Sequence, residues 1–587
     1  MKRRLLAVTV LGLGGGAAVG GCDVILGLER ATLIQPDGGS GSGATTTSSS
    51  TGGPTCSDGM KDGVETDKDC GGGICNPCQN GQGCIVGPDC LSKQCQGGTC
   101  VAFSCTDKVK NGSETDVDCG GGTCNRCDIG QICLVSTDCV SDICKTKVCK
   151  DPHVWSDGFE PMGPGDVTDV AVDNTGNVGL AVNLIGDVDF GGGPLTGAGL
   201  DYDVAVAKFD SSGNHLWSKR FGDVNGQLVP GIVFDPTGAM LLTGYLAGTV
   251  DFGGGPLSSA GGCCPSSSDV FIAKLDVDGK HVWSKNFGNS SPQEALGVAS
   301  DSQGNVLVTG KFFASMNFGD GVLTSGGKED VFVAKLNPSG ATLWSRRYGD
   351  ATTQYGERIA SDGSGNVIVS GAFQGTLDFG VGGKLVSNGG FDIFVVKMSA
   401  NGTPVWSISY GSDGDETHPS IAVDAAGDVF VTSAFLKTIN VGKLPLTSVG
   451  GNDLLLAKIA PDGKFVWSKK FGDAKDQVVH SGPRVSVDAA GNVVLTGGFA
   501  GTIDFGGGVM MSAGEDDVFP VKFDPAGKHL WSRRFGDVKN QGSTGIAVSG
   551  AENVVIAGNF DGMLDFGGAP LVSASGGDIF VAKFLLP

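Results

Sequence analysis

Six side chains with amide or carboxylate groups recur at one position of a repeated sequence pattern. Each lies five residues after the glycine of an FG or YG pair, and the set is Gln227, Gln293, Gln354, Glu416, Gln477 and Gln541. We expect them just before the innermost strand of each repeat, where they could form a ligand-binding ring at a channel mouth. They could instead hydrogen-bond backbone between repeats. Repetition favours the second interpretation, because ligand sites usually break symmetry.

No catalytic set accompanies this pattern. The six histidines have no nucleophile–base pair or metal-ligand set near them in the sequence. A DFG tripeptide recurs at Asp189, Asp251, Asp378, Asp504 and Asp565 without the other motifs that accompany it in kinases. We therefore predict no catalytic residue and a protein that is not an enzyme.

Sixteen cysteines fall into two modules, residues 56–100 and 105–149, which are offset by 49 residues throughout. The CxxC pairs could ligate zinc, but eight cysteines in such a short exported segment favour four disulfides per module. The pairing stays open, because eight cysteines allow 105 pairings. The cysteines are Cys56, Cys70, Cys75, Cys78, Cys84, Cys90, Cys95 and Cys100, then Cys105, Cys119, Cys124, Cys127, Cys133, Cys139, Cys144 and Cys149.

Acidic residues precede one cysteine in each module and could bind Ca²⁺. Asp67 and Asp69 stand before Cys70, and Asp116 and Asp118 occupy the same places in the second module. Alternating carboxylates supply the oxygen ligands that Ca²⁺ prefers, but the spacing departs from the EF-hand loop. Acidic turn residues that face water are the favoured interpretation, and no other cofactor is predicted.

The first 21 residues read as an export signal, with a basic start and an apolar stretch. The stretch ends in VGGC, which resembles the bacterial lipobox and implies cleavage before Cys22 and lipidation of its thiol. An ordinary secretory signal with a chance cysteine is the alternative. Residues 22–55 then form a Ser/Thr/Gly-rich tether. These features predict an exported protein held to the bacterial cell envelope, at the outer membrane or the periplasmic face, by lipid alone.

Seven tryptophans, spaced 61 to 66 residues apart, mark a repeat array over residues 153–587. Each unit has four strand signals with alternating apolar residues, joined by short turns that carry glycine. The recurring patterns DxxGNVxVTG and DxFxAKxxxxGxxxWSxxFG resemble the bacterial SBBP-type repeat family. This resemblance implies a seven-bladed β-propeller and no single activity. The fold class is therefore all-β, with two disulfide-rich modules before the propeller.

The fragment HVWSDGFE at 153–160 has the pattern of a fourth strand but precedes every complete unit. The last unit ends one strand short at residue 587. We predict that the fragment completes the last blade and closes the ring, which removes two open sheet edges.

Composition narrows the function classes. A formal net charge of −22 excludes a nucleic-acid partner, because a phosphate backbone requires a basic surface. Cys263 and Cys264 remain after the modules and Cys22, and a vicinal or an intermolecular disulfide are both open for them. The sequence favours a propeller that binds or scaffolds a protein or glycan on a stapled stalk. An extracellular glycan hydrolase or lyase and a Ca²⁺-dependent adhesin are the alternatives.

Overall fold

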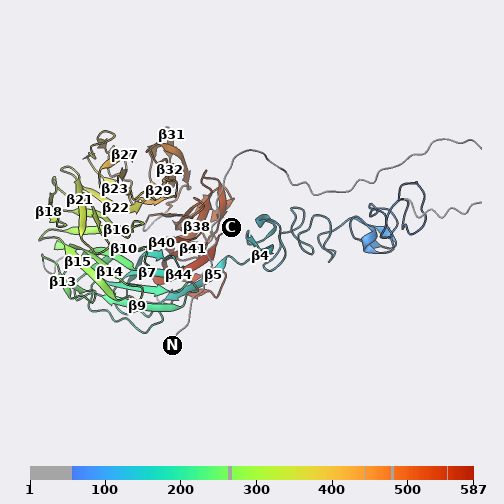
Figure 1. The fold of residues 1–587 in the computed structure, drawn as a ribbon, viewed down its shortest axis with the longest axis horizontal. Coiled ribbons are helices and arrows are strands. Elements are labelled where there is room, and N and C mark those ends of the chain that lie inside the picture. Colours follow the sequence, from blue (N-terminus) through green and yellow to red (C-terminus); the bar gives the residue numbers. More distant parts are fainter. Residues whose placement is uncertain are drawn as a thin grey trace, which may run out of the picture.

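The computed structural model describes residues 56–586, with the exception of 262–266, 443, 478–481, 551–552 and 575 (Figure 1). The predicted signal peptide (1–21), Cys22 and the tether lie outside the described residues, as do Cys263 and Cys264. In the described part of the chain, no helix has the length and apolar character needed to cross a membrane.

Seven four-stranded antiparallel sheets, here called blades and numbered in the order of their innermost strands, form the disc in Figure 1. The innermost strands contact one another in a closed ring. They are β6 (Gly165–Val172), β10 (Gln227–Phe234), β16 (Gln293–Ser300), β22 (Gln354–Ser361), β28 (Ser420–Val423), β34 (Arg484–Val487) and β40 (Gln541–Ser549). The second strands are β7 (Val178–Leu184), β11 (Met240–Leu246), β17 (Val306–Phe312), β23 (Val367–Phe373), β29 (Val429–Phe435), β35 (Val493–Phe499) and β41 (Asn553–Phe560).

The outer half of each blade completes the sheet. The third strands are β8 (Asp203–Phe209), β14 (Asp269–Leu275), β20 (Asp330–Leu336), β26 (Asp392–Met398), β32 (Asp453–Ile459), β38 (Asp517–Phe523) and β44 (Asp578–Leu585). The outermost strands are β9 (His215–Phe221), β15 (His281–Phe287), β21 (Thr342–Tyr348), β27 (Pro404–Tyr410), β33 (Phe465–Phe471), β39 (His529–Ser532) and β5 (His153–Phe159).

Short hairpins connect the second and third strands of blades 2 to 7. They are β12 (Thr249–Asp251) with β13 (Pro256–Ser258), β18 (Ser315–Asn317) with β19 (Val322–Thr324), β24 (Thr376–Leu377) with β25 (Leu385–Val386), β30 (Thr438–Val441) with β31 (Leu444–Thr447), β36 (Thr502–Asp504) with β37 (Val509–Met511), and β42 (Met563–Leu564) with β43 (Leu571–Val572). The DFG aspartates cap the turns: the Asp251 carboxylate accepts hydrogen bonds from the Gly253 and Gly255 backbone N–H groups. The repeated tripeptide is thus a structural element.

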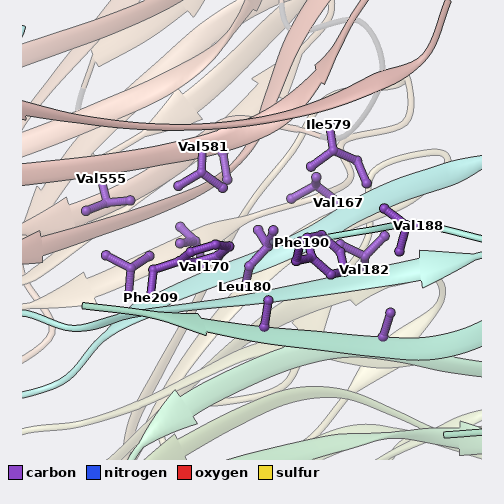
Figure 2. Close-up of a cluster of buried hydrophobic side chains, with 14 of the residues drawn as sticks. Val167, Val170, Leu180, Val182, Val188, Phe190, Phe209, Val555, Ile579 and Val581 are labelled. Atoms are coloured by element: carbon purple, nitrogen blue, oxygen red, sulfur yellow. The ribbon is translucent and has the colours of Figure 1, made fainter. Parts of the chain in front are cut away.

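The predicted ring closure is confirmed. β5 pairs antiparallel with β44 and gives blade 7 the strand order β40-β41-β44-β5. The innermost layer closes as well, because β40 contacts β6. Figure 2 shows the apolar cluster at this junction, where Val555, Ile579 and Val581 of blade 7 meet Leu180 and Phe209 of blade 1. Burying each such side chain contributes about 1.5–3 kcal/mol, so the closure is a full blade-to-blade interface.

The middle strands are buried on both faces, although alternating apolar residues are typical of strands with only one face in a core. Every residue of β8 and of β14 is buried. Each blade is covered on both faces by its neighbours, so side chains of either orientation lose contact with water. This explains why a polar residue such as Lys208 is only 2% exposed within β8.

The recurring tryptophan of one blade contacts the turn glycine of the next blade, which explains why both residues recur. The Trp217 indole nitrogen donates to the Val277 carbonyl of the next blade at 3.0 Å. A Cβ added to Gly279, whose φ is +75°, would lie 2.8 Å from the Trp217 ring. Only glycine accommodates both the backbone conformation and the ring. The blade 7 boundary differs, because chain ends replace that turn and the Trp531 indole nitrogen is buried with no partner among the described residues.

The two N-terminal modules have the same disulfide pairing. Module 1 contains η1 (Gly87–Asp89), β1 (Cys95–Gln96) and β2 (Thr99–Cys100), and module 2 contains η2 (Ser136–Asp138), β3 (Cys144–Lys145) and β4 (Val148–Cys149). The buried apolar cluster of each module consists of cysteines. The eight disulfides are Cys56–Cys75, Cys70–Cys78, Cys84–Cys95, Cys90–Cys100, Cys105–Cys124, Cys119–Cys127, Cys133–Cys144 and Cys139–Cys149.

Candidate functional site in the central channel

The six amide and carboxylate groups do not form a ligand ring, and that interpretation is corrected. The residues Gln227, Gln293, Gln354, Glu416, Gln477 and Gln541 are at most 1% exposed. The Gln227 amide nitrogen donates to the Asp223 carboxylate at 2.9 Å and to the Ala247 carbonyl at 2.7 Å. The Asp223 backbone N–H donates to the Gln227 side-chain oxygen. The glutamine therefore braces the connection between blades against its own blade, instead of bonding one blade's strands to the next.

The acidic residues before Cys70 and Cys119 are turn caps. The Asp67 carboxylate accepts the backbone N–H groups of Lys68 and Gly83. Its counterpart Asp116 accepts those of Val117 and Ile132, Asp69 accepts that of Gly59, and Asp118 accepts that of Lys108. These bonds occupy the oxygens that Ca²⁺ would need, and the structure does not gather the four carboxylates into one site.

The zinc alternative for the modules also fails on geometry. The metal-ligand groupings that the described residues form consist of cysteines, joined in two cases by Glu65 or Glu114. Each of these cysteines is bonded to another cysteine in a disulfide. A disulfide sulfur is not the thiolate that ligates zinc. The CxxC spacing in these modules thus reflects disulfide pairing.

Four histidines belong to the outer edge of the blades. The His215 ring nitrogen Nε2 lies 3.0 Å from the Ser218 hydroxyl, and His153, His281 and His529 repeat this contact. His480 lies outside the described residues. His418 is different, because it faces the central channel and has a φ of +56°, which is unusual for a residue with a side chain.

A cavity of about 350 Å³ occupies the central channel and is lined by residues from all seven blades. β-Bulges shape it: in blades 1, 2, 3, 4 and 7, the pairing of the innermost strand with the second strand shifts at the same place. A bulge inserts an extra residue and re-aims side chains. The residues inserted at these bulges include Thr168, Pro230, Leu296, Glu357 and Thr544, and all five line the cavity.

The position after the bulge breaks the symmetry of the ring. In the register of the innermost strands it is held by Asp169, Gly231, Gly297, Arg358, Ser420, Arg484 and Gly545. Four blades thus carry glycine or serine, and three carry a charge. Arg358 and Arg484 line the cavity, together with Glu357 and His418. These residues and Asp169 are called the channel cluster below.

Hydrogen bonds to neighbouring blades fix the channel cluster. Arg484 Nε donates to the Thr544 carbonyl of blade 7 at 2.7 Å, and one Arg358 guanidinium nitrogen donates to the Leu296 carbonyl of blade 3 at 3.3 Å. The Asp169 carboxylate accepts the Ile232 N–H of blade 2. His418 Nδ1 lies 3.3 Å from a Glu357 carboxylate oxygen. The cluster is therefore held by blades that surround the channel on several sides.

Burial and mutual charge shape the electrostatics. Burial, together with the neighbouring charge of Arg358, lowers the pKa of Arg484 to about 9. Burial raises the pKa of Asp169, which the charges of Arg358 and Arg484 oppose. The charges of Arg358 and Arg484 thus repel each other, while those of Asp169 and Glu357 attract Arg484.

The sequence analysis missed this cluster. Its members lie more than 300 residues apart, between Asp169 and Arg484. When the repeats are aligned, the position four residues before the DxxG aspartate holds Asp169, Arg358 and Arg484 in three repeats. The other repeats have glycine or serine at this position. That departure from the repeat was the available signal.

Comparisons with known proteins place the chain among repeat proteins without assigning an activity. No protein-family model matches it. It is 22% identical over 455 residues to an uncharacterized WD repeat-containing protein of Acanthamoeba polyphaga mimivirus, covering 62% of this chain and 32% of that protein. It is 25% identical over 188 residues to the regulatory protein FlaEY of Caulobacter vibrioides, covering 32% of this chain and 19% of that protein. The chain thus matches about a third and a fifth of the lengths of these relatives.

Three solved structures are similar to the chain over most of its length at low identity. The β-propeller domain of the Trilobed protease from Pyrococcus furiosus has 10% identity and a TM-score of 0.33, covering 71% of this chain and 93% of that one. The quinohemoprotein alcohol dehydrogenase from Comamonas testosteroni has 12% identity and a TM-score of 0.35, covering 74% and 76%. A protein of unknown function from Dyadobacter fermentans has 10% identity and a TM-score of 0.37, covering 74% and 99%. At these TM-scores the similarities assign no activity or ligand to this chain.

Proposed function

We propose that the protein is a non-enzymatic binding protein of the bacterial cell envelope, with the propeller as its recognition disc. The channel cluster is the observation that carries this proposal. A ring built from repeats departs from its own pattern at Asp169, Arg358 and Arg484, around a cavity of a size that small ligands occupy. Charged groups that neighbouring blades hold in place form a pre-organised site, which lowers the cost of binding.

The envelope location has separate support. Two modules with eight disulfides fit an oxidising compartment outside the cytoplasm. The lipobox resemblance of VGGC and the SBBP-type pattern of the repeats favour a bacterial lipoprotein. A Cys22→Ser variant is expected to lose radiolabelled palmitate and to leave the membrane fraction. Unchanged membrane attachment of this variant would contradict the lipid anchor.

The binding function is tested on the full chain with fragments of envelope glycan and of envelope peptides. Calorimetry is expected to give saturable binding for one of these ligand classes, and an Arg358→Gln, Arg484→Gln double variant is expected to lose it. Chromatography of the glycan after prolonged incubation provides the control, because a hydrolase or lyase would shorten it. Glycan cleavage that disappears in a Glu357→Gln variant would replace the binding proposal with the hydrolase alternative.

A further inference from the structure

The two arginines of the channel cluster have more N–H donors than their hydrogen bonds use. A guanidinium carries five N–H donors, and the bonds of Arg358 and Arg484 to Leu296 and Thr544 engage one nitrogen in each. Among the described residues, neither arginine forms an ion pair with a carboxylate, whereas Arg220 and Arg347 on the outermost strands, and Arg534 just after one, do. The channel arginines therefore present unfilled donors to the cavity that they line.

An anion between the two arginines would relieve a cost already present in the folded chain. The two guanidinium charges repel each other, and a charge that is withdrawn from water is expensive unless it is paired. The lowered pKa of Arg484 reports this unfavourable environment. A planar carboxylate or a phosphate can accept paired hydrogen bonds from such groups. The cluster is thus arranged to bind an anion.

The remaining members of the cluster select among anions. Glu357 lines the same cavity and the charge of Asp169 acts on both arginines, so a dianionic phosphate would meet more repulsion than a monoanionic carboxylate. The Glu357 carboxylate and the Thr168 hydroxyl oxygen offer acceptors at the cavity wall. These acceptors suit a ligand that carries hydroxyl groups beside its carboxylate.

We propose that the channel binds a small hydroxylated carboxylate, of the size and chemistry of a uronic acid, with its carboxylate between Arg358 and Arg484. This inference rests on the proposed binding function and adds the class of ligand. The cavity of about 350 Å³ lies in the range of small-molecule sites and holds one or two sugar units. Glu357 and His418, which contact each other at 3.3 Å, then lie beside the hydroxyl-bearing part of the ligand.

The test uses the full chain and D-glucuronate, with D-glucose, inorganic phosphate and L-glutamate as comparison ligands, measured by calorimetry at neutral pH. Glucuronate is expected to bind and glucose is not, because the sugar ring alone lacks the anion. Arg358→Gln and Arg484→Gln are each expected to weaken glucuronate binding roughly tenfold or more, as for a lost charge-assisted hydrogen bond. Arg346→Gln on β21 is the matched control and is expected to leave binding unchanged. Melting temperatures of all variants check that the propeller is folded.

Each other outcome overturns a defined part of the inference. Preferred binding of phosphate would refute the carboxylate, and preferred binding of glutamate would replace the hydroxylated ligand with an amino acid. Glucuronate binding that survives both arginine substitutions would refute the site. Binding of a neutral glycan, with none of glucuronate, would refute this inference and leave the proposed binding function intact. If neither these ligands nor the envelope fragments bind, the proposed function fails as well.

Discussion

Buried Lys–Asp ion pairs join the third strand of a blade to the turn after its first strand, and the described residues of blade 7 form no such pair. The pairs are Lys208–Asp173, Lys274–Asp235, Lys335–Asp301, Lys397–Asp362, Lys458–Asp424 and Lys522–Asp488. In blade 7, Ser549 stands in place of the aspartate, and Lys583 is only 5% exposed. The Lys583 ammonium donates to the Ser211 carbonyl of blade 1 at 2.9 Å and has no ion-pair partner among the described residues. Burial lowers the pKa of Lys583.

A Ser549→Asp substitution is expected to supply the missing partner and to stabilise the ring closure. The Ser549 hydroxyl and the Lys583 ammonium lie 3.7 and 3.9 Å from the position that a Cβ on Gly176 would take. The two groups are therefore neighbours, and a carboxylate at 549 would bring a negative charge close to the ammonium. In blade 1, side-chain and backbone hydrogen bonds and Lys208 lower the pKa of Asp173 from 3.8 to about 2 against the opposing effect of burial. A shift of this size corresponds to about 2 kcal/mol. Screening near the face of the disc, and the absence of the turn bonds that Asp173 makes, reduce the expected gain to about 1 kcal/mol.

The assay is guanidinium chloride unfolding of the full chain with its disulfides intact. Ser549→Asn is the matched control, because it has nearly the same shape without the charge. Asp173→Asn in blade 1 is the reciprocal change and is expected to destabilise by a similar or larger amount, because it removes one partner of a buried pair. An aspartate with a lowered folded pKa contributes its stability above the unfolded pKa near 3.9 and loses it as the pH falls toward 2. Equal stability of Ser549→Asp and Ser549→Asn at pH 7 would refute the reasoning.

Three further changes test other parts of the fold. Burial, with a contribution from Glu416, raises the pKa of Asp392 to about 6, so ionisation of this carboxyl costs stability as the pH rises from about 4 to 6. A Ser409→Arg substitution is expected to stabilise the protein by roughly 1 kcal/mol at pH 7 and little at pH 4. An equal effect at both pH values would contradict this prediction. Deleting 153–159 removes β5 and is expected to cost roughly 5 kcal/mol and to cause aggregation in light scattering; an unchanged melting temperature would refute the closure argument. A Cys56→Ser, Cys75→Ser variant is expected to lose about 3 kcal/mol in module 1, seen as proteolysis of that module while the propeller melts unchanged.

The strands, turns and ring closure could be predicted from the sequence because each depends on local chemistry. Alternating apolar residues mark strands, and a glycine such as Gly279 is required where the chain turns with a positive φ beneath a tryptophan. The count of strand signals then shows that the last unit lacks one and that 153–160 supplies it. The disulfide pairing could not be predicted, because spacing alone does not say which sulfurs meet in space.

The orientation of polar side chains was the harder problem. Gln227 and Arg358 both belong to innermost strands, and sequence period alone does not say which of them faces the channel. The bulge decides the question for Arg358, because it shifts the register by one residue and turns Glu357 and its neighbour toward the cavity. Bulges leave little trace in a single sequence, so the buried glutamines looked like the better candidates for a site.

Departures from the repeat have two different physical origins in this protein. The departures at Ser549 and Trp531 belong to blade 7 and its boundary with blade 6, where β5 completes the ring, and the Trp531 indole nitrogen has no hydrogen-bond partner among the described residues. Asp169, Arg358 and Arg484 share one position of the innermost strands, in blades whose Lys–Asp ion pairs follow the repeat. Glycine or serine at this position suffices for packing in four other blades. Burial disfavours the charges of Asp169 and Arg484, a cost that the ring itself does not require, and this is the physical reason to propose that the cluster binds a ligand.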